Sequence, residues 1–168
     1  MPELNYRYLT EQDSAILEQF QCDDEPTVRR FLVEQAWELQ KLNLADTRLY
    51  FNESDELIGY FTLYNDMMQI GKHKRRKHGL ASLPSYKYYP SVKLHYLGVD
   101  SRYRKQRYGE YLLLAALNTV KEISEQSGCV FLSVESLPSC VSFYERYEFH
   151  RLSYNAPYTD MFFKIGEL

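Results

Sequence analysis

A short basic turn between an apolar stretch and a helical stretch carries the residues best suited to bind a phosphate group. Arg104, Lys105 and Arg107 supply three cations close together, and Gly109 follows them. The first N–H groups of a helix have no partner inside the helix, and the helix dipole places partial positive charge at the same end. Gly109 has no Cβ, so the backbone can approach a ligand closely there. The turn therefore predicts a phosphate site, although these residues alone are equally compatible with a solvated basic turn.

Such a turn needs a strand before it and a helix after it, and the hydrophobic pattern predicts both. Residues 92–99 are apolar on both faces, which is typical of a central strand. After the turn, apolar residues recur at helical spacing, and Gly128 follows them as a C-terminal cap. The apolar face of this predicted helix consists of Leu112, Leu113, Ala116, Leu117, Val120 and Ile123.

The turn and a second segment together resemble the GNAT family of acetyltransferases. The family's turn is commonly written Q/R-x-x-G-x-G/A, and residues 104–109 match it at Arg104 and Gly109, with Arg107 in place of the middle glycine. Residues 142–149 are similar to the family's F-Y-E-x-x-G-F segment, with Glu148 in place of glycine. The resemblance covers roughly residues 57–165.

This resemblance implies an acetyl-CoA-dependent N-acetyltransferase with an α/β (α+β) fold, in which a mixed central sheet is flanked by helices. It implies that backbone groups of Leu97, Gly98 and Val99 pair with pantetheine and polarise the thioester carbonyl, because fixed dipoles stabilise developing charge without reorganisation. It also places Tyr144 at the family's catalytic tyrosine position, as the general acid that protonates the departing thiolate. The remaining contacts with acetyl-CoA that it implies fall on Arg104, Lys105, Gln106, Arg107, Tyr108, Gly109 and Glu110.

The general base is less well determined by the sequence. Glu135, at the end of a predicted strand, can take a proton from the amine through a water, and we predict it as the second catalytic residue. His95 is an alternative because its reference pKa lies near neutrality. Both side chains, like Tyr144, are also compatible with purely structural roles, and family members often use water chains without a single base.

The rest of the pattern predicts one domain over residues 1–168. Helical spacing continues from residue 28 to 42, further strands are expected at residues 48–51, 57–64 and 130–135, and a short helix is expected before Tyr147. Residues 149–152 and 161–165 are expected to form a closing antiparallel hairpin. Alternating strands and helices with such a hairpin predict a mixed α/β fold.

Composition limits the function classes. With 168 residues, 45% hydrophobic content and a net charge of -3, the chain can bury one core and has no overall attraction to nucleic acid or anionic membrane. No apolar stretch approaches the ~18 residues needed to cross a bilayer, and the N-terminus lacks the regions of a signal peptide. The three cysteines have no metal-ligand spacing, so we expect free thiols, no metal site and a cytoplasmic location.

One stretch is strongly basic, although the chain as a whole has a negative net charge. Residues 72–77 are all Lys, Arg or His, and we expect an exposed loop that is either solvated or in contact with a polyanion such as RNA. We expect nucleic acid to bind through this loop if it binds at all.

Three functions remain open at this point. The first is acetyl transfer to a primary amine of a small molecule, peptide or protein. The second follows from Phe20-Gln21-Cys22 and Gly59-Tyr60-Phe61-Thr62-Leu63, which resemble GNAT toxins that acetylate aminoacyl-tRNA. The third is a degenerate acyl-CoA-binding module, which Arg107 and Glu148 allow and Tyr144 disfavours. Because dimers are common in the family, a homodimer is a possible assembly.

Overall fold

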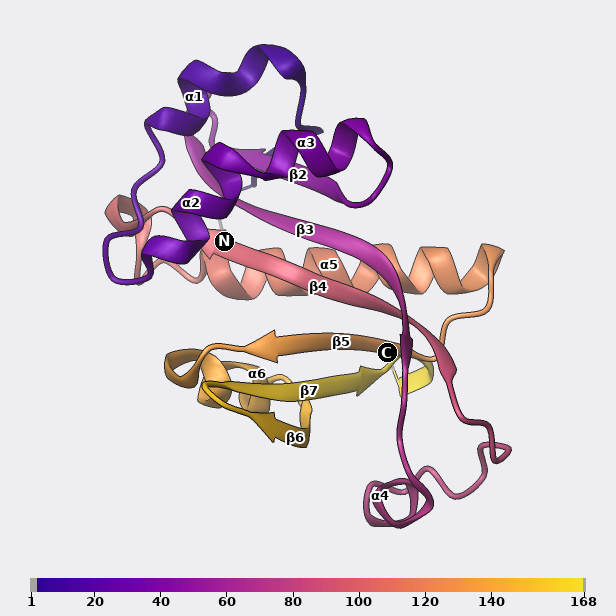
Figure 1. The fold of residues 1–168 in the computed structure, drawn as a ribbon. Helices are drawn as coiled ribbons and strands as arrows, with labels where there is room; N and C mark the ends of the chain where they lie inside the picture. Colours follow the sequence, from indigo (N-terminus) through magenta and orange to yellow (C-terminus); the bar gives the residue numbers. More distant parts are fainter. Residues whose placement is uncertain (1–2, 168) are drawn as a thin grey trace. The chain divides into compact units, whose positions relative to one another are not determined.

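The computed structural model describes residues 3–167, and its strands form one mixed seven-stranded sheet (Figure 1). The sheet order is β1-β2-β3-β4-β5-β7-β6, with β4 and β5 parallel and the hairpin of β6 and β7 antiparallel. The strands are β1 (Asn5–Tyr8), β2 (Asp46–Phe51), β3 (Leu57–Met68), β4 (Tyr89–Val99), β5 (Phe131–Ser136), β6 (His150–Asn155) and β7 (Tyr158–Lys164). The predicted mixed sheet flanked by helices is confirmed.

The helices are α1 (Ser14–Glu18), α2 (Pro26–Glu34), α3 (Ala36–Lys41), α4 (Lys72–Lys77), α5 (Tyr108–Gln126) and α6 (Val141–Arg146). Single turns of 3₁₀ helix occur at Glu11–Asp13, Ser101–Tyr103, Pro138–Cys140 and Ile165–Glu167. The helical spacing predicted through residue 42 is present, but Gln35, with φ -122°, separates α2 from α3. Across the described residues, no helix has the length and apolar character needed to span a membrane.

The chain divides into two compact units, and β3, β4 and α5 each contribute to both. The first unit extends to Tyr64 and resumes from His95 to Ala116. In it, β1, β2 and β3 form an antiparallel meander, and α2 packs on the end of β4, where the rings of Phe31 and Tyr96 stack with centroids 4.2 Å apart. This unit carries the basic turn. One domain over residues 1–168 stays a prediction.

The second unit contains Asn65–Leu94 and the chain from Leu117 onward. Its strand β5 pairs with β4 on one side and with β7 on the other. One hydrophobic cluster of this unit packs around Phe131 and Phe162, and it includes Met68, Ile70, Leu80 and Tyr89. On α6, Tyr144 contacts Phe149, which in turn contacts Phe163 of β7, with ring centroids 5.3 and 5.6 Å apart. This unit carries Tyr144 and Glu135.

The prediction of an exposed loop at residues 72–77 is wrong, because this segment forms helix α4. Arg75 is buried at 6% exposure, and its guanidinium donates to the carbonyl oxygen of Ile70 (2.9 Å) and to Ser85 Oγ (3.2 Å). The same guanidinium lies 5.9 Å from the centre of the Tyr89 ring. A run of charged residues has no apolar stripe that would predict a helix, yet one buried arginine anchors this one.

Candidate active site

Two glycines allow close packing at the end of β4, one against the neighbouring backbone and one against a side chain of α2. A Cβ on Gly59 would lie 2.5 Å from the carbonyl oxygen of Gly98 and 2.7 Å from Leu112 Cδ1. A Cβ on Gly98 would lie 2.4 Å from Val28 Cγ1. Only glycine fits at either position. The predicted pantetheine-binding residues therefore sit on a tightly packed strand end, where Leu97 is half-buried and Gly98 and Val99 are buried.

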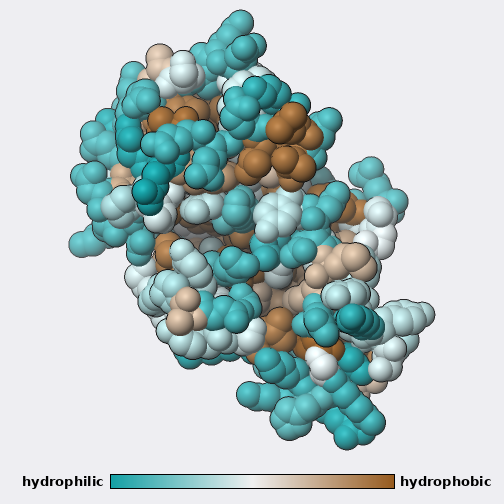
Figure 2. All heavy atoms as spheres, in the orientation of Figure 1, coloured by the Kyte–Doolittle hydropathy of each residue, from teal (hydrophilic) through white to brown (hydrophobic). Residues whose placement is uncertain are grey.

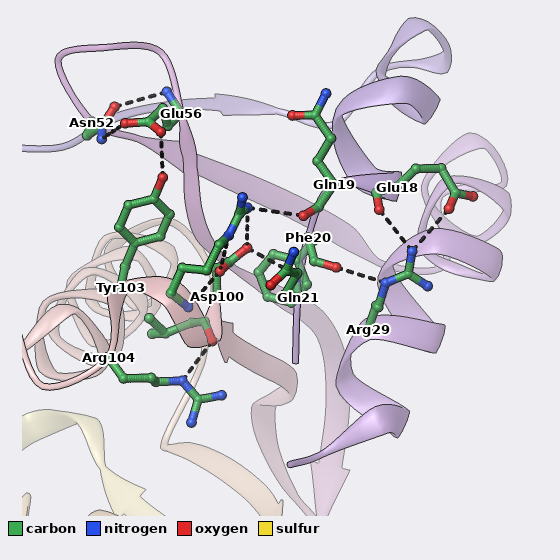
Figure 3. Close-up of polar contacts among 12 residues, drawn as sticks. Glu18, Gln19, Phe20, Gln21, Arg29, Asn52, Glu56, Asp100, Tyr103 and Arg104 are labelled. Atoms are coloured by element: carbon green, nitrogen blue, oxygen red, sulfur yellow. Dashed lines mark hydrogen bonds and ion pairs between the residues drawn. The ribbon is translucent and has the colours of Figure 1, made fainter. Parts of the chain in front are cut away.

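A buried carboxylate fixes the chain just after β4 (Figure 3). Asp100 is fully buried and accepts hydrogen bonds from the backbone N–H of Gln21 (3.0 Å), the backbone N–H of Arg102 (2.9 Å) and the Arg102 guanidinium (2.8 and 3.0 Å). Burial raises the pKa of Asp100, but the hydrogen bonds from Arg102 and Gln21 outweigh it and hold the pKa below its ordinary value. Sequence patterns alone assign no role to Asp100, because a single acid after a strand is not distinctive.

Arg104 also anchors the turn through its side chain. Its Nε donates to the carbonyl oxygen of Val99 (3.0 Å), and its two Nη atoms donate to the carboxylate of Asp24 (2.9 and 3.1 Å). One Nη also lies 3.3 Å from Cys22 Sγ. The charge of Arg104 is therefore already paired with a carboxylate. Contact between Arg104 and acetyl-CoA stays a prediction. The backbone of Arg104 is better placed to make this contact than its side chain, which is already paired.

The backbone of the turn has the form of an anion-binding site. Lys105 and Arg107 have positive φ values of 62° and 65°, and α5 begins immediately afterwards at Tyr108. Left-handed residues that alternate with others curve successive N–H groups toward one point, and the start of a long helix adds partial positive charge. Arg107 thus adopts the conformation that glycine favours at this family position. Binding of the acetyl-CoA pyrophosphate by this turn stays a prediction, and the backbone conformation shows that the missing glycine does not rule it out.

The charged side chains of the turn differ in whether a carboxylate of the protein already pairs with them. Arg107 pairs with Glu110, and its Nε lies 2.6 Å from Glu110 Oε2. Lys105 is exposed and forms no ion pair with any residue that the structure describes. Gln106 is exposed, Gly109 is half-buried and Tyr108 is buried. Among the cations of the turn, Lys105 is therefore the one best able to contact a phosphate.

Tyr144 is buried at 6% exposure on α6, yet its hydroxyl makes no hydrogen bond within residues 3–167. Two other buried tyrosines have hydroxyls that are hydrogen-bonded within the protein. Tyr60 donates to the carbonyl oxygen of Val28 (2.7 Å), and Tyr89 donates to that of Pro84 (2.5 Å). Burial, with a smaller contribution from the neighbouring Cys140 thiol, raises the pKa of Tyr144 above its ordinary value. Tyr144 therefore holds a proton at neutral pH that no described protein group already uses.

The two candidate bases lie in different units. Glu135 is on β5, with Oε1 2.9 Å from the ammonium of Lys93 and a side chain that is 54% exposed. His95 is half-buried among aromatic rings, with centroid distances of 5.0 Å to Phe31 and 5.1 Å to Tyr64. The structure thus brings Tyr144 and Glu135 into one unit, and His95 and the basic turn into the other.

Glu148 stands where the family's second segment has glycine, and the effect of this replacement on stability can be measured. Its φ is 66°, and a non-glycine residue in this region costs about 1–2 kcal/mol. Glycine loses more chain entropy on folding, which offsets about 0.5–1 kcal/mol of that cost. We expect Glu148→Gly to raise the free energy of unfolding by about 0.5–1 kcal/mol in urea titrations. Glu148→Ala keeps the strain and should give no gain; an equal gain in both variants would contradict the strain argument.

Buried tyrosines should also make the fold sensitive to alkali. Burial raises the pKa of Tyr50 to about 12, and it raises those of Tyr60 and Tyr144. Tyrosines of the unfolded chain titrate at about pH 10. Above that pH, the unfolded state loses protons that the folded state retains. The contribution of these tyrosines to stability should be constant from neutral pH to about pH 9 and should then fall by about 1.4 kcal/mol per pH unit for each tyrosine. Thermal melts against pH measure this, and Tyr60→Phe should reduce the slope; an unchanged slope would contradict it.

The comparisons identify the class of protein that this fold and site define. The family model described as the Acetyltransferase (GNAT) family matches residues 13–149, so the chain belongs to this family. The protein is therefore an acetyl-CoA-dependent acetyltransferase with acetyl-CoA as its co-substrate, as the resemblance predicted. No curated protein matches the sequence.

Several solved structures, one of them described as a bacterial toxin, share the fold over almost the whole chain. A tyrosine-to-phenylalanine mutant of KacT has a TM-score of 0.82 at 23% identity, covering 98% of this chain and 96% of its own. A structure described as a bacterial toxin has a TM-score of 0.83 at 21% identity, covering 99% and 93%. AtaT complexed with acetyl-methionyl-tRNAfMet has a TM-score of 0.80 at 24% identity, covering 98% and 96%. At these identities, the similarity shows a common fold.

Proposed function

We propose that this enzyme transfers the acetyl group of acetyl-CoA directly to a primary amine, with Tyr144 as the general acid. The observation that supports this most strongly is the buried, protonated Tyr144, whose hydroxyl pairs with no described residue and is still open to solvent. A tyrosine that served only to pack would be expected to pair its hydroxyl, as Tyr60 does. A binding module without catalysis has no need of such a proton.

The other residues then have separate tasks. The backbone of residues 104–110 and the Lys105 ammonium hold the phosphates, and Gly98 and Val99 offer backbone N–H groups to pantetheine and the thioester carbonyl. Acetyl-CoA supplies the activated acetyl group. Tyr144 Oη gives its proton to the sulfur as the carbon–sulfur bond breaks, and the amine nitrogen, on forming the amide bond, loses a proton. We assign this second proton to Glu135 through a water, because its carboxylate lies on β5 and is 54% exposed, so that water can reach it.

A second candidate acceptor is aminoacyl-tRNA, and helix α4 is the observation that favours it. Lys72, Arg76 and Lys77 are exposed on this helix, and Figure 2 shows hydrophilic residues gathered over it. The structurally similar AtaT was solved with acetyl-methionyl-tRNAfMet. We also propose that the protein is cytoplasmic and forms a homodimer.

A panel of amines, peptides and charged tRNA, assayed for release of the CoA thiol, tests the proposal and separates the acceptors. If tRNA is the acceptor, replacing Lys72, Arg76 and Lys77 together with Gln should weaken tRNA binding at least about tenfold at physiological salt and should flatten its salt dependence. Turnover on a small amine should be unchanged. Equal tRNA binding by the wild type and the triple variant would exclude a role for α4 in binding RNA.

A further inference from the structure

The loop between α1 and α2 is fastened to the chain that leads from β4 into the basic turn (Figure 3). The carboxylate of Asp100 accepts a hydrogen bond from the backbone N–H of Gln21 (3.0 Å). The backbone N–H of Ser101 donates to the carbonyl oxygen of Gln21 (2.8 Å). Asp24 follows Gln21 by three residues in the same loop. Contacts that do not involve Asp24 itself therefore bring it to the turn and keep it there.

Arg104, the first residue of the turn, joins Asp24 to the end of β4 through one side chain. Its two Nη atoms donate to the two carboxylate oxygens of Asp24 (2.9 and 3.1 Å), and its Nε donates to the carbonyl oxygen of Val99 (3.0 Å). A bidentate pair of this kind fixes the direction of the guanidinium as well as its place. Hydrogen bonds from this guanidinium hold the pKa of Asp24 below its ordinary value, so Asp24 is ionised at neutral pH.

The turn needs support from outside because two of its residues have a strained backbone. Lys105 and Arg107 have φ values of 62° and 65°, and residues other than glycine reach this region only at a cost in free energy. Such strain persists where the surrounding structure holds the backbone in place. Arg104 directly precedes the first strained residue, and its own backbone is extended, with ψ of 163°. Asp24 therefore acts, through Arg104, on the conformation that curves the N–H groups of the turn toward one point.

The charge of Asp24, taken by itself, acts against the binding of acetyl-CoA. Asp24 and the pyrophosphate are both negative, and Asp24 pairs with the first cation of the turn. An effect of charge alone would thus make acetyl-CoA bind more tightly once Asp24 is neutralised. We propose instead that Asp24 is a positioning residue, which holds residues 104–110 in the form that binds the phosphates. This inference rests on the proposed function, which places the phosphates at this turn.

Calorimetry with acetyl-CoA on the full chain, well below the melting temperature, tests the sign of this effect. Asp24→Asn keeps the size of the side chain and should weaken binding about threefold to tenfold, although it removes a negative charge. The ratio of the two affinities should persist at high salt, where an effect of charge alone would be screened. The matched control is Glu18→Gln, whose carboxylate pairs with Arg29 at 3.1 Å beside the same loop. This variant should bind acetyl-CoA as the wild type does.

A double variant tests whether Asp24 acts through Arg104. Arg104→Lys keeps the positive charge, but a single ammonium cannot form the two contacts with Asp24 and the contact with Val99 together. If both substitutions break one connection, the double variant Asp24→Asn/Arg104→Lys should bind acetyl-CoA no more weakly than Arg104→Lys alone. Fully additive losses, or binding by Asp24→Asn that equals or exceeds that of the wild type, would overturn the proposal.

Lys105→Gln tests the place of the phosphates separately. This exposed ammonium is proposed to contact them directly, so the variant should weaken acetyl-CoA binding, and its loss should shrink at high salt. If Lys105→Gln bound acetyl-CoA as tightly as the wild type, the phosphate site would be wrong and the positioning role would fall with it. If Lys105→Gln weakened binding and Asp24→Asn did not, the phosphate site would stand and the role of Asp24 alone would be wrong.

Discussion

Replacing Tyr144 with Phe should lower kcat by about 10²–10⁴-fold and leave acetyl-CoA affinity almost unchanged. The substitution keeps the ring that contacts Phe149 and removes only the hydroxyl, which has no hydrogen-bond partner among the described residues. General acid catalysis typically contributes a factor of this size. Because the proton moves only as the carbon–sulfur bond breaks, the loss should appear in kcat and not in acceptor binding. Steady-state kinetics on the best acceptor, with calorimetry for acetyl-CoA, measure both quantities.

Tyr147→Phe is the matched control for this variant. Tyr147 directly follows α6 and also contacts Phe143, but it is half-buried and lies outside the predicted catalytic position. The Tyr147→Phe variant should keep full turnover. If Tyr144→Phe also kept full turnover with chemistry as the rate-limiting step, the protonation of the thiolate would have to come from a water.

The largest effect on stability should follow from Gly59→Ala. The added methyl would lie 2.5 Å from the Gly98 carbonyl oxygen, a backbone atom that cannot turn aside as a side chain can. Overpacking of this kind costs about 3 kcal/mol, or roughly 10 °C in melting temperature for a chain of this length. Because the displaced backbone is the predicted pantetheine-binding strand end, acetyl-CoA affinity should fall as well. Thermal melts and calorimetry measure the two effects.

Gly71→Ala is the control for backbone entropy. A Cβ at Gly71 meets no atom within 4 Å, and its φ of -73° suits any residue. This variant should melt within about 2 °C of the wild type. Equal melting temperatures for Gly59→Ala and Gly71→Ala would show that the approach of β3 to β4 is looser than the structure indicates.

Hydrophobic periodicity predicted the elements that hold the site. The apolar face of residues 112–123 indicated α5, because that face of the helix is buried. The run of apolar residues at 92–99 indicated β4, because this strand has a neighbouring strand on each side. The place of Tyr144 came from a motif and not from periodicity. A single tyrosine in a short helix has no spacing that distinguishes a proton donor from a packing residue.

Other features depended on contacts that no local pattern records. The substitutions at Arg107 and Glu148 were visible in the sequence, but their positive φ values are imposed by the surrounding fold. Helix α4 was missed because its one buried residue, Arg75, is charged and is satisfied by partners outside the helix. Asp100 acquired its importance from hydrogen-bond partners that only the folded chain brings near, such as the backbone N–H of Gln21.

The most direct test of the account is a mass measurement of the acceptor after incubation with acetyl-CoA. Each acceptor of the panel is incubated with the wild type, and the acetylated product is compared with the CoA thiol released. We predict that at least one primary amine gains a single N-linked acetyl group for every thiol released, and that Tyr144→Phe slows both together. Saturable binding of acetyl-CoA without acetyl transfer to any amine, peptide or charged tRNA would contradict the account and would favour a binding module without catalysis.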